Sequence, residues 1–111
     1  MTLTEKLTNI GRMYAAAVPN CYHYWRPASI DAPWLVWAED SGAELVAGNT
    51  VAEFGISGTA DYFTKTEMDE AIDRINAEQN RLAGFVWTLN SVQYEEETGL
   101  IHYEWTWSYM G

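Results

Sequence analysis

The sequence is poor in several residue types. Its single cysteine, Cys21, excludes an intrachain disulfide and a cluster of thiolate metal ligands. Only six lysine and arginine residues stand against sixteen aspartate and glutamate residues, which gives a net charge of −10. This charge repels a phosphate backbone, so we expect no direct nucleic-acid binding.

Long apolar runs are also lacking. No stretch approaches the roughly eighteen apolar residues of a membrane-spanning helix. The N-terminus does not have the charged-then-apolar order of a signal peptide. We therefore expect an intracellular, soluble protein without a membrane partner.

Hydrophobic side chains, by contrast, are plentiful. They make up 48% of the 111 residues, and aromatic residues make up 14%, which is more than a disordered chain carries. No linker, internal repeat or low-complexity segment divides the sequence. We expect one folded domain over residues 1–111.

The clearest local pattern lies at residues 101–109, where large apolar side chains alternate with others. Such a period of two predicts a half-buried β-strand. The large side chains are Ile101, Tyr103, Trp105, Trp107 and Tyr109.

Two segments have the apolar spacing of amphipathic helices. Thr2 and Glu5 have the spacing of a capping box before the first helix, and Pro19 ends it. The second is expected to follow Thr66, with Met68 on its apolar stripe and Gly84 as its C-terminal cap.

Four further strands are predicted, at residues 21–26, 34–39, 54–62 and 85–94. Residues 41–49 are expected to form a loop, and 95–99 a polar hairpin turn. Gly55 and Gly58 indicate a bulge, a bend or the close approach of another backbone. The alternation of the fourth strand changes phase near Asn90 and Ser91, which predicts a β-bulge.

Together these elements predict an α+β fold of order α-β-β-β-α-β-β, with an antiparallel sheet of about five strands and two helices packed on one face. The strand at 34–39 is apolar on both faces, because Trp34 and Trp37 have opposite parity. Such a strand needs two covers, and the helices supply only one. Sheet curvature, a loop or another subunit could supply the second.

Candidate catalytic groups are few, so we expect that the protein is not an enzyme and binds no cofactor. Cys21 and His23 share a strand face, as a nucleophile and its base would, but no glycine-rich loop or nucleophile turn accompanies them. His102 beside Glu104 is typical of an exposed polar pair. A buried, inert thiol is the simpler interpretation of Cys21.

The acidic turn and the tryptophans have alternative interpretations. The spacing of Glu95, Glu96 and Glu97 matches no calcium loop, so a solvated turn is favoured over a metal site. The aromatic residues could form a core, a carbohydrate-stacking platform or a protein–protein interface. The candidates for stacking on a sugar are Trp37, Trp87, Trp105 and Trp107.

The element order resembles the tail-completion proteins of long-tailed phages, which include tail-terminator and tail-to-head joining proteins. The segments that carry the resemblance are 32–37, which is similar to a proline-tyrosine-valine strand, 58–65, which runs from a strand toward a helix, and the closing aromatic hairpin. The heavy tryptophan content departs from the family pattern.

The resemblance implies a non-enzymatic virion protein that forms a hexameric ring at the head-proximal end of the tail. Its partners would be other copies of itself, the tail tube protein and the head–tail connector, and it would be made in the bacterial host cytoplasm. An acidic channel lining would let DNA pass without sticking. The loop at 43–51 and the turn at 95–99 are segments that would reach neighbouring subunits.

We expect the interface to include Tyr24, Trp34, Trp37, Glu95, Glu96, Glu97 and Trp107. A carbohydrate-binding module is the alternative function. A third hypothesis, an acidic DNA mimic that inhibits a nucleic-acid enzyme, depends on the charge alone.

Overall fold

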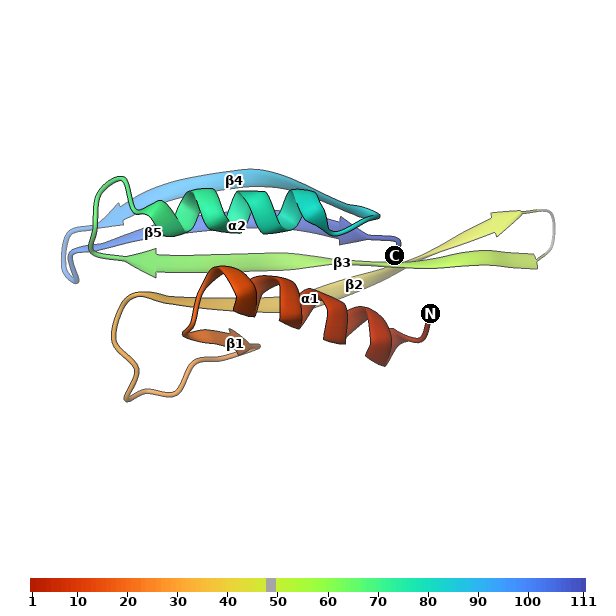
Figure 1. The fold of residues 1–111 in the computed structure, drawn as a ribbon, viewed down its shortest axis with the longest axis horizontal. Coiled ribbons are helices and arrows are strands. Elements are labelled where there is room, and N and C mark those ends of the chain that lie inside the picture. Colours follow the sequence, from red (N-terminus) through yellow and green to blue (C-terminus); the bar gives the residue numbers. More distant parts are fainter. Residues whose placement is uncertain (48–49) are drawn as a thin grey trace.

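The computed structural model describes the backbone of residues 1–47 and 50–111, and the side chains of 1–42 and 55–111. The fold is α+β and has the predicted element order (Figure 1). The elements are α1 (Leu3–Ala17), β1 (Cys21–His23), β2 (Trp34–Ala47), β3 (Thr50–Thr64), α2 (Glu70–Arg81), β4 (Phe85–Glu95) and β5 (Leu100–Tyr109).

The five strands form one sheet in the order β1-β2-β3-β5-β4. The sheet is mixed, because β1 pairs with β2 in parallel while every other pair is antiparallel. The prediction of a purely antiparallel sheet was therefore wrong. The first strand ends at His23, because Tyr24 takes a φ of 75°, and a loop at 24–33 then carries the chain back to enter β2 in the same direction.

Both helices lie on the same face of the sheet (Figure 1). The capping box of α1 is confirmed, since Thr2 and Glu5 exchange hydrogen bonds between side chain and backbone. The second helix starts later than expected. Its N-cap is Asp69, and Met68 lies outside the helix with a φ of 52° and an exposed side chain, so its place on the apolar stripe was wrong.

The predicted loop at 41–49 is also wrong. Strand β2 continues to Ala47, and β3 begins at Thr50 and pairs with it in a long hairpin that projects beyond the helices (Figure 1). Residues 48–49 lie outside the described part. The hairpin makes the molecule elongated, with extents of 52 × 24 × 23 Å.

The core lies between the helices and the sheet. Its largest fully buried side chains include Trp105, Tyr14, Tyr62 and Tyr109. On β3 the predicted inward face is confirmed for Ile56, Gly58, Ala60 and Tyr62, whereas the side chain of Phe54 lies outside the described residues.

Two irregularities predicted from the sequence are confirmed. The register of β4 against β5 shifts between Leu89 and Ser91, which exchanges the inward and outward positions along β4. At Gly58, an added Cβ would clash with the carbonyl oxygen of Ala38 and with the ring of Trp107. The glycine therefore marks a close approach of another backbone.

Candidate functional site

The helices leave the opposite face of the sheet open. The strand register places Trp34, Phe63 and His102 side by side on this face, followed by a row of Val36, Asp61 and Glu104. We call this surface the open face. Closer to the hairpin it carries small polar side chains, among which the hydroxyls of Ser57 and Ser108 lie 3.0 Å apart.

Part of the open face is covered by the loop at 24–33. The Arg26 guanidinium lies 3.9 Å from the centre of the Trp34 ring, and Phe63 stacks on the same indole at 4.7 Å. Trp34 is thereby buried to 6% exposure. A loop thus supplies the second cover of this strand at Trp34.

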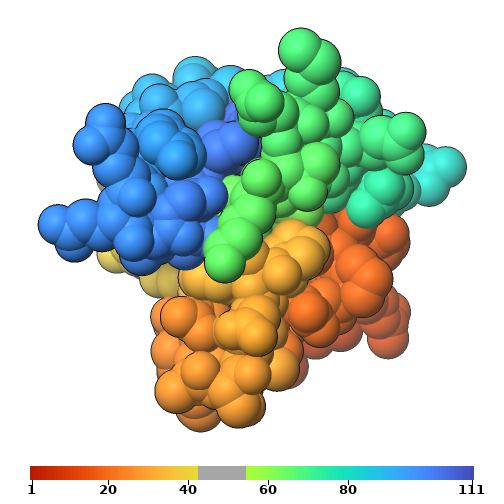
Figure 2. Space-filling model, turned by 90° about the vertical axis from the view of Figure 1, so that its left-hand side faces the viewer, coloured from red at the N-terminus to blue at the C-terminus, as the bar shows by residue number. Residues whose placement is uncertain are grey.

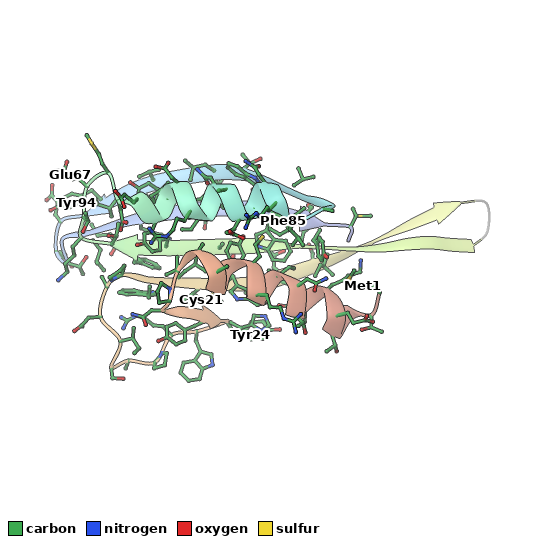
Figure 3. All side chains as sticks on the ribbon, in the orientation of Figure 1. Met1, Cys21, Tyr24, Glu67, Phe85 and Tyr94 are labelled. Carbon is green, nitrogen blue, oxygen red and sulfur yellow. The ribbon has the colours of Figure 1, made fainter. Side chains whose placement is uncertain are left out.

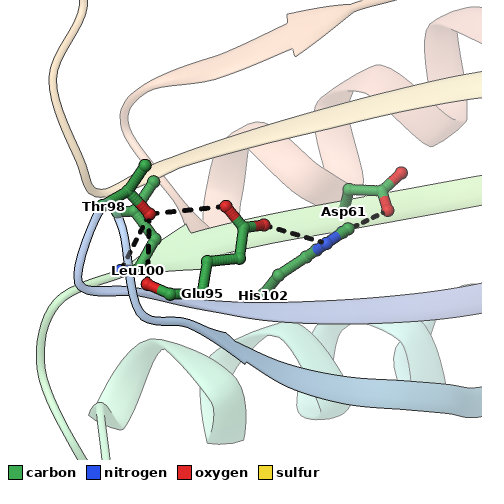
Figure 4. Close-up of polar contacts among 5 residues, drawn as sticks. All are labelled: Asp61, Glu95, Thr98, Leu100 and His102. Carbon is green, nitrogen blue, oxygen red and sulfur yellow. Dashed lines mark hydrogen bonds and ion pairs between the residues drawn. The ribbon is translucent and has the colours of Figure 1, made fainter.

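His102 lies between two carboxylates at the edge of this cluster (Figure 4). Its Nε2 atom is 2.7 Å from Asp61 Oδ1, and its Nδ1 atom is 3.8 Å from Glu95 Oε1. Phe63 stacks on the imidazole at 4.2 Å. Burial raises the pKa of Asp61, although the hydrogen bond with His102 opposes the shift.

The arrangement around His102 favours a structural role. The imidazole bridges β3, β5 and the end of β4, and no hydroxyl or thiol nucleophile contacts it among its hydrogen bonds and ion pairs. In the described residues, no group of three histidine, cysteine or acidic side chains has the geometry to hold a metal ion. Sequence reasoning placed His102 with Glu104, whereas Glu104 accepts a hydrogen bond from Asn90.

A second histidine cluster lies at the β1 edge of the sheet. His23 is stacked between Tyr24 and Trp37, at 3.8 Å and 3.9 Å, and its Nε2 atom is 2.7 Å from Glu39. Burial raises the pKa of Cys21 to about 11, so its thiol is protonated at neutral pH. The thiol has no feature of an activated nucleophile.

The predicted interface residues do not lie together. Tyr24, Glu96 and Glu97 are exposed, and Glu95 is half-buried. The other three, Trp34, Trp37 and Trp107, are buried by the chain itself. Their role in an interface stays a prediction.

The tryptophans proposed to stack on a sugar offer few free ring faces. Trp37, Trp105 and Trp107 are buried, and the indole of the half-buried Trp87 donates a hydrogen bond to Asn80. The most exposed tryptophan is Trp25, at 69%, in the loop after β1. Nothing in the arrangement favours carbohydrate binding.

No protein-family model matches the chain, and no curated protein matches it. Among the described residues, no helix is long and apolar enough to cross a membrane.

Sequence reasoning missed one exposed apolar surface, on strand β4. Leu89, Val92 and Tyr94 are exposed on the helix side of the sheet, Val86 is exposed on the opposite face, and Met68 is exposed in the segment before α2. The phase change at residues 90–91 was the available signal. It places Val92 and Tyr94 on the helix side of the sheet, where a short second helix does not cover them.

Proposed function

We propose that this chain is a structural subunit of a phage or prophage tail, of the tail-completion or terminator type, which assembles into a ring at the head–tail joint. The observation that carries the proposal is the projecting β2–β3 hairpin (Figure 1). The subunit acts through contacts between proteins and performs no catalysis.

Among the described residues, no third strand pairs with the outer part of the hairpin. Pairing of β3 with β5 ends at Ile56, and pairing of β1 with β2 ends at Trp37. From the pair Ala43 and Gly55 outward, no third strand of the described residues joins the hairpin. A two-stranded ribbon is marginally stable in water, so a neighbouring subunit is a natural support.

The charge supports the same function. A net charge of −10 disfavours contact with a phosphate backbone, as a ring around a DNA channel requires. The partners under this proposal are other copies of the chain, the tail tube protein and the head–tail connector. The protein would be found in the virion tail, and in the host cytoplasm during assembly.

The test is a variant with a shortened hairpin, in which residues 44–54 are replaced by Asn-Gly. Ala43 and Gly55 are a cross-strand pair, so a two-residue turn can close between them. The variant keeps every buried core residue among the described side chains. We expect the unchanged chain to form rings, alone at high concentration or on isolated tail tubes, and the variant to stay monomeric with a similar unfolding midpoint.

Light scattering after size exclusion gives the mass, and negative-stain microscopy shows rings and tail-tip binding. A chain that is monomeric at all concentrations and binds no tail tip would contradict the proposal. So would rings formed equally well by the shortened variant. The position of the coding sequence between head–tail connector genes and a major tail protein gene is an independent prediction.

A further inference from the structure

An open groove lies at the end of the molecule opposite the hairpin. It has a volume of about 600 Å³ and is lined by Lys65, Glu67, Val92, Tyr94, Gly99 and Ile101. These residues come from the segment before α2, from the end of β4 and from the turn into β5. Figure 2 views this end of the molecule, and Figure 3 shows Glu67 and Tyr94 together there.

The floor of the groove consists of side chains that point to the core side of the sheet but are not covered. Val92 is paired with Tyr103, and Tyr94 with Ile101, on the same face as the buried Trp105. Val92 nevertheless remains 50% exposed and Tyr94 64% exposed. Contiguous exposed apolar side chains of this kind mark interaction sites.

Met68 follows the lining residue Glu67 and is, among the described side chains, the most exposed large apolar residue, at 95%. Its φ of 52° is unfavourable for a residue with a long side chain. Backbone strain at an exposed apolar residue is a feature of binding sites. Met68 is suited to pack on a partner at the rim of the groove.

The charges around the groove specify the partner. Glu67 and Lys65 line the groove, and Glu96 and Glu97 are exposed in the turn that leads to the lining residue Gly99, so acidic side chains outnumber basic ones in these two segments. Such a rim repels phosphates and anionic lipid surfaces and attracts basic side chains. Strand β4 is also the edge of the sheet, where an extended segment can add by backbone hydrogen bonds.

We infer that this groove is a docking site for an extended, basic segment of a partner protein, with an apolar side chain anchored between Val92, Tyr94 and Ile101 and lysine or arginine side chains on the acidic rim. The inference goes beyond ring assembly and does not depend on it. It concerns the end of the molecule opposite the hairpin.

The probe is a fluorescein-labelled seven-residue peptide in which lysine and valine alternate. One control peptide replaces each valine by serine, and another replaces each lysine by glutamate. Fluorescence anisotropy with the full chain should show that the basic apolar peptide binds at least tenfold more tightly than either control. In amide NMR spectra the peptide should shift Val92, Tyr94 and Gly99.

Two variants test the apolar contacts and the charged contacts of the peptide separately. Tyr94→Ala removes the anchor site, and Glu67→Gln combined with Glu96→Gln and Glu97→Gln removes the charges of the rim; each should weaken binding at least tenfold. Val86→Ala, on the opposite face of the same strand, is the matched control and should bind as the unchanged chain does.

Three outcomes would overturn the inference. These are no binding of the basic apolar peptide at millimolar concentration, equal binding of the serine peptide, and equal binding by Tyr94→Ala. The shortened-hairpin variant should bind the peptide normally. Failure of this inference is thereby distinguishable from failure of ring assembly.

Discussion

At the scale of single residues, the aromatic side chains owe their roles to neighbours that are distant in the sequence. Trp34 is buried where the Arg26 guanidinium and the Phe63 ring both pack on its indole, and Trp105 is buried beneath α2, whose Asn76 accepts its indole hydrogen bond. Trp25, in contrast, is 69% exposed. Residue type alone therefore does not decide which tryptophan meets solvent or a partner.

Cys21 provides a prediction at this scale. Burial raises its pKa from 9.0 to about 11, so the thiolate fraction at pH 8 is about a hundredfold smaller than for an ordinary thiol. Alkylation by iodoacetamide at pH 8 should be about a hundredfold slower in the folded chain than in urea, followed by mass spectrometry. Glutathione under both conditions controls for the effect of urea. Equal rates in both states would refute the shifted pKa.

Gly58 provides a second prediction. A methyl group at this position would overlap the Ala38 carbonyl oxygen and the Trp107 ring, and a backbone atom cannot move aside as a side chain can. Gly58→Ala should therefore lower the free energy of unfolding by about 3 kcal/mol, measured with urea. Thr59→Ala, a neighbour on the open face, should cost less than about 1 kcal/mol. Similar losses for both variants would show that the close approach is not the cause.

At the scale of elements, the position of the second helix is set by a network that spans two elements. The Asp69 carboxylate accepts hydrogen bonds from the Ala71 amide and from the hydroxyls of Tyr62 and Thr64, all at 2.7–2.9 Å. The hydroxyls come from the end of β3. Helical spacing predicted α2 itself, but its first residue depends on this contact with the sheet.

Asp69→Ala should lower the free energy of unfolding by about 2 kcal/mol at pH 7, because it removes the cap and leaves two hydroxyls without their acceptor. Asp69→Asn keeps an acceptor oxygen and should cost less. Burial alone would raise the pKa of Asp69, but the bonds from Ala71, Thr64 and Tyr62 together outweigh it and lower the pKa. The stabilisation is therefore present above about pH 3.8 and is lost as pH falls through the lower folded value.

Urea denaturation of both variants between pH 2.5 and pH 7 measures this effect. The difference between Asp69→Ala and the unchanged chain should shrink toward the acid end. A difference that is constant over this range would mean that the carboxylate charge contributes nothing to the cap.

The element order and the bulge in β4 were predictable because both depend on the spacing of apolar residues that are close together in the sequence. The parallel pairing of β1 and the extended β2–β3 hairpin were not, since both depend on register between distant segments. Aspartate, serine and glycine at 40–42 indicate a loop by composition, yet Ser41 and Gly42 pair with β3, and Asp40 is the extra residue of a bulge in β2. The exposed groove beside Tyr94 was not predicted, because it too depends on register between distant segments.

At the scale of the whole molecule, one layer of two helices faces a sheet that is longer than they are. The sequence predicted two helices, which can cover only one apolar face of the sheet. In the structure, the loop at 24–33 covers part of the other face, at Trp34. The outer part of the hairpin and the groove beside Met68 lie at the two ends of the molecule (Figure 1). These two ends are the surfaces that we propose contact other proteins.

The charge of the whole molecule leads to the last prediction. Sixteen acidic and six basic side chains repel one another on balance, and salt screens this repulsion. Raising NaCl from 20 mM to 500 mM should raise the free energy of unfolding in urea, by about 1 kcal/mol. The variant with Gln at Glu67, Glu96 and Glu97 has a net charge of −7, that is −10 plus 3, and should gain less. A stability that falls with salt would mean that specific ion pairs outweigh the net repulsion; the pair between Arg81 and Glu78, 3.1 Å apart, would then be the first to examine.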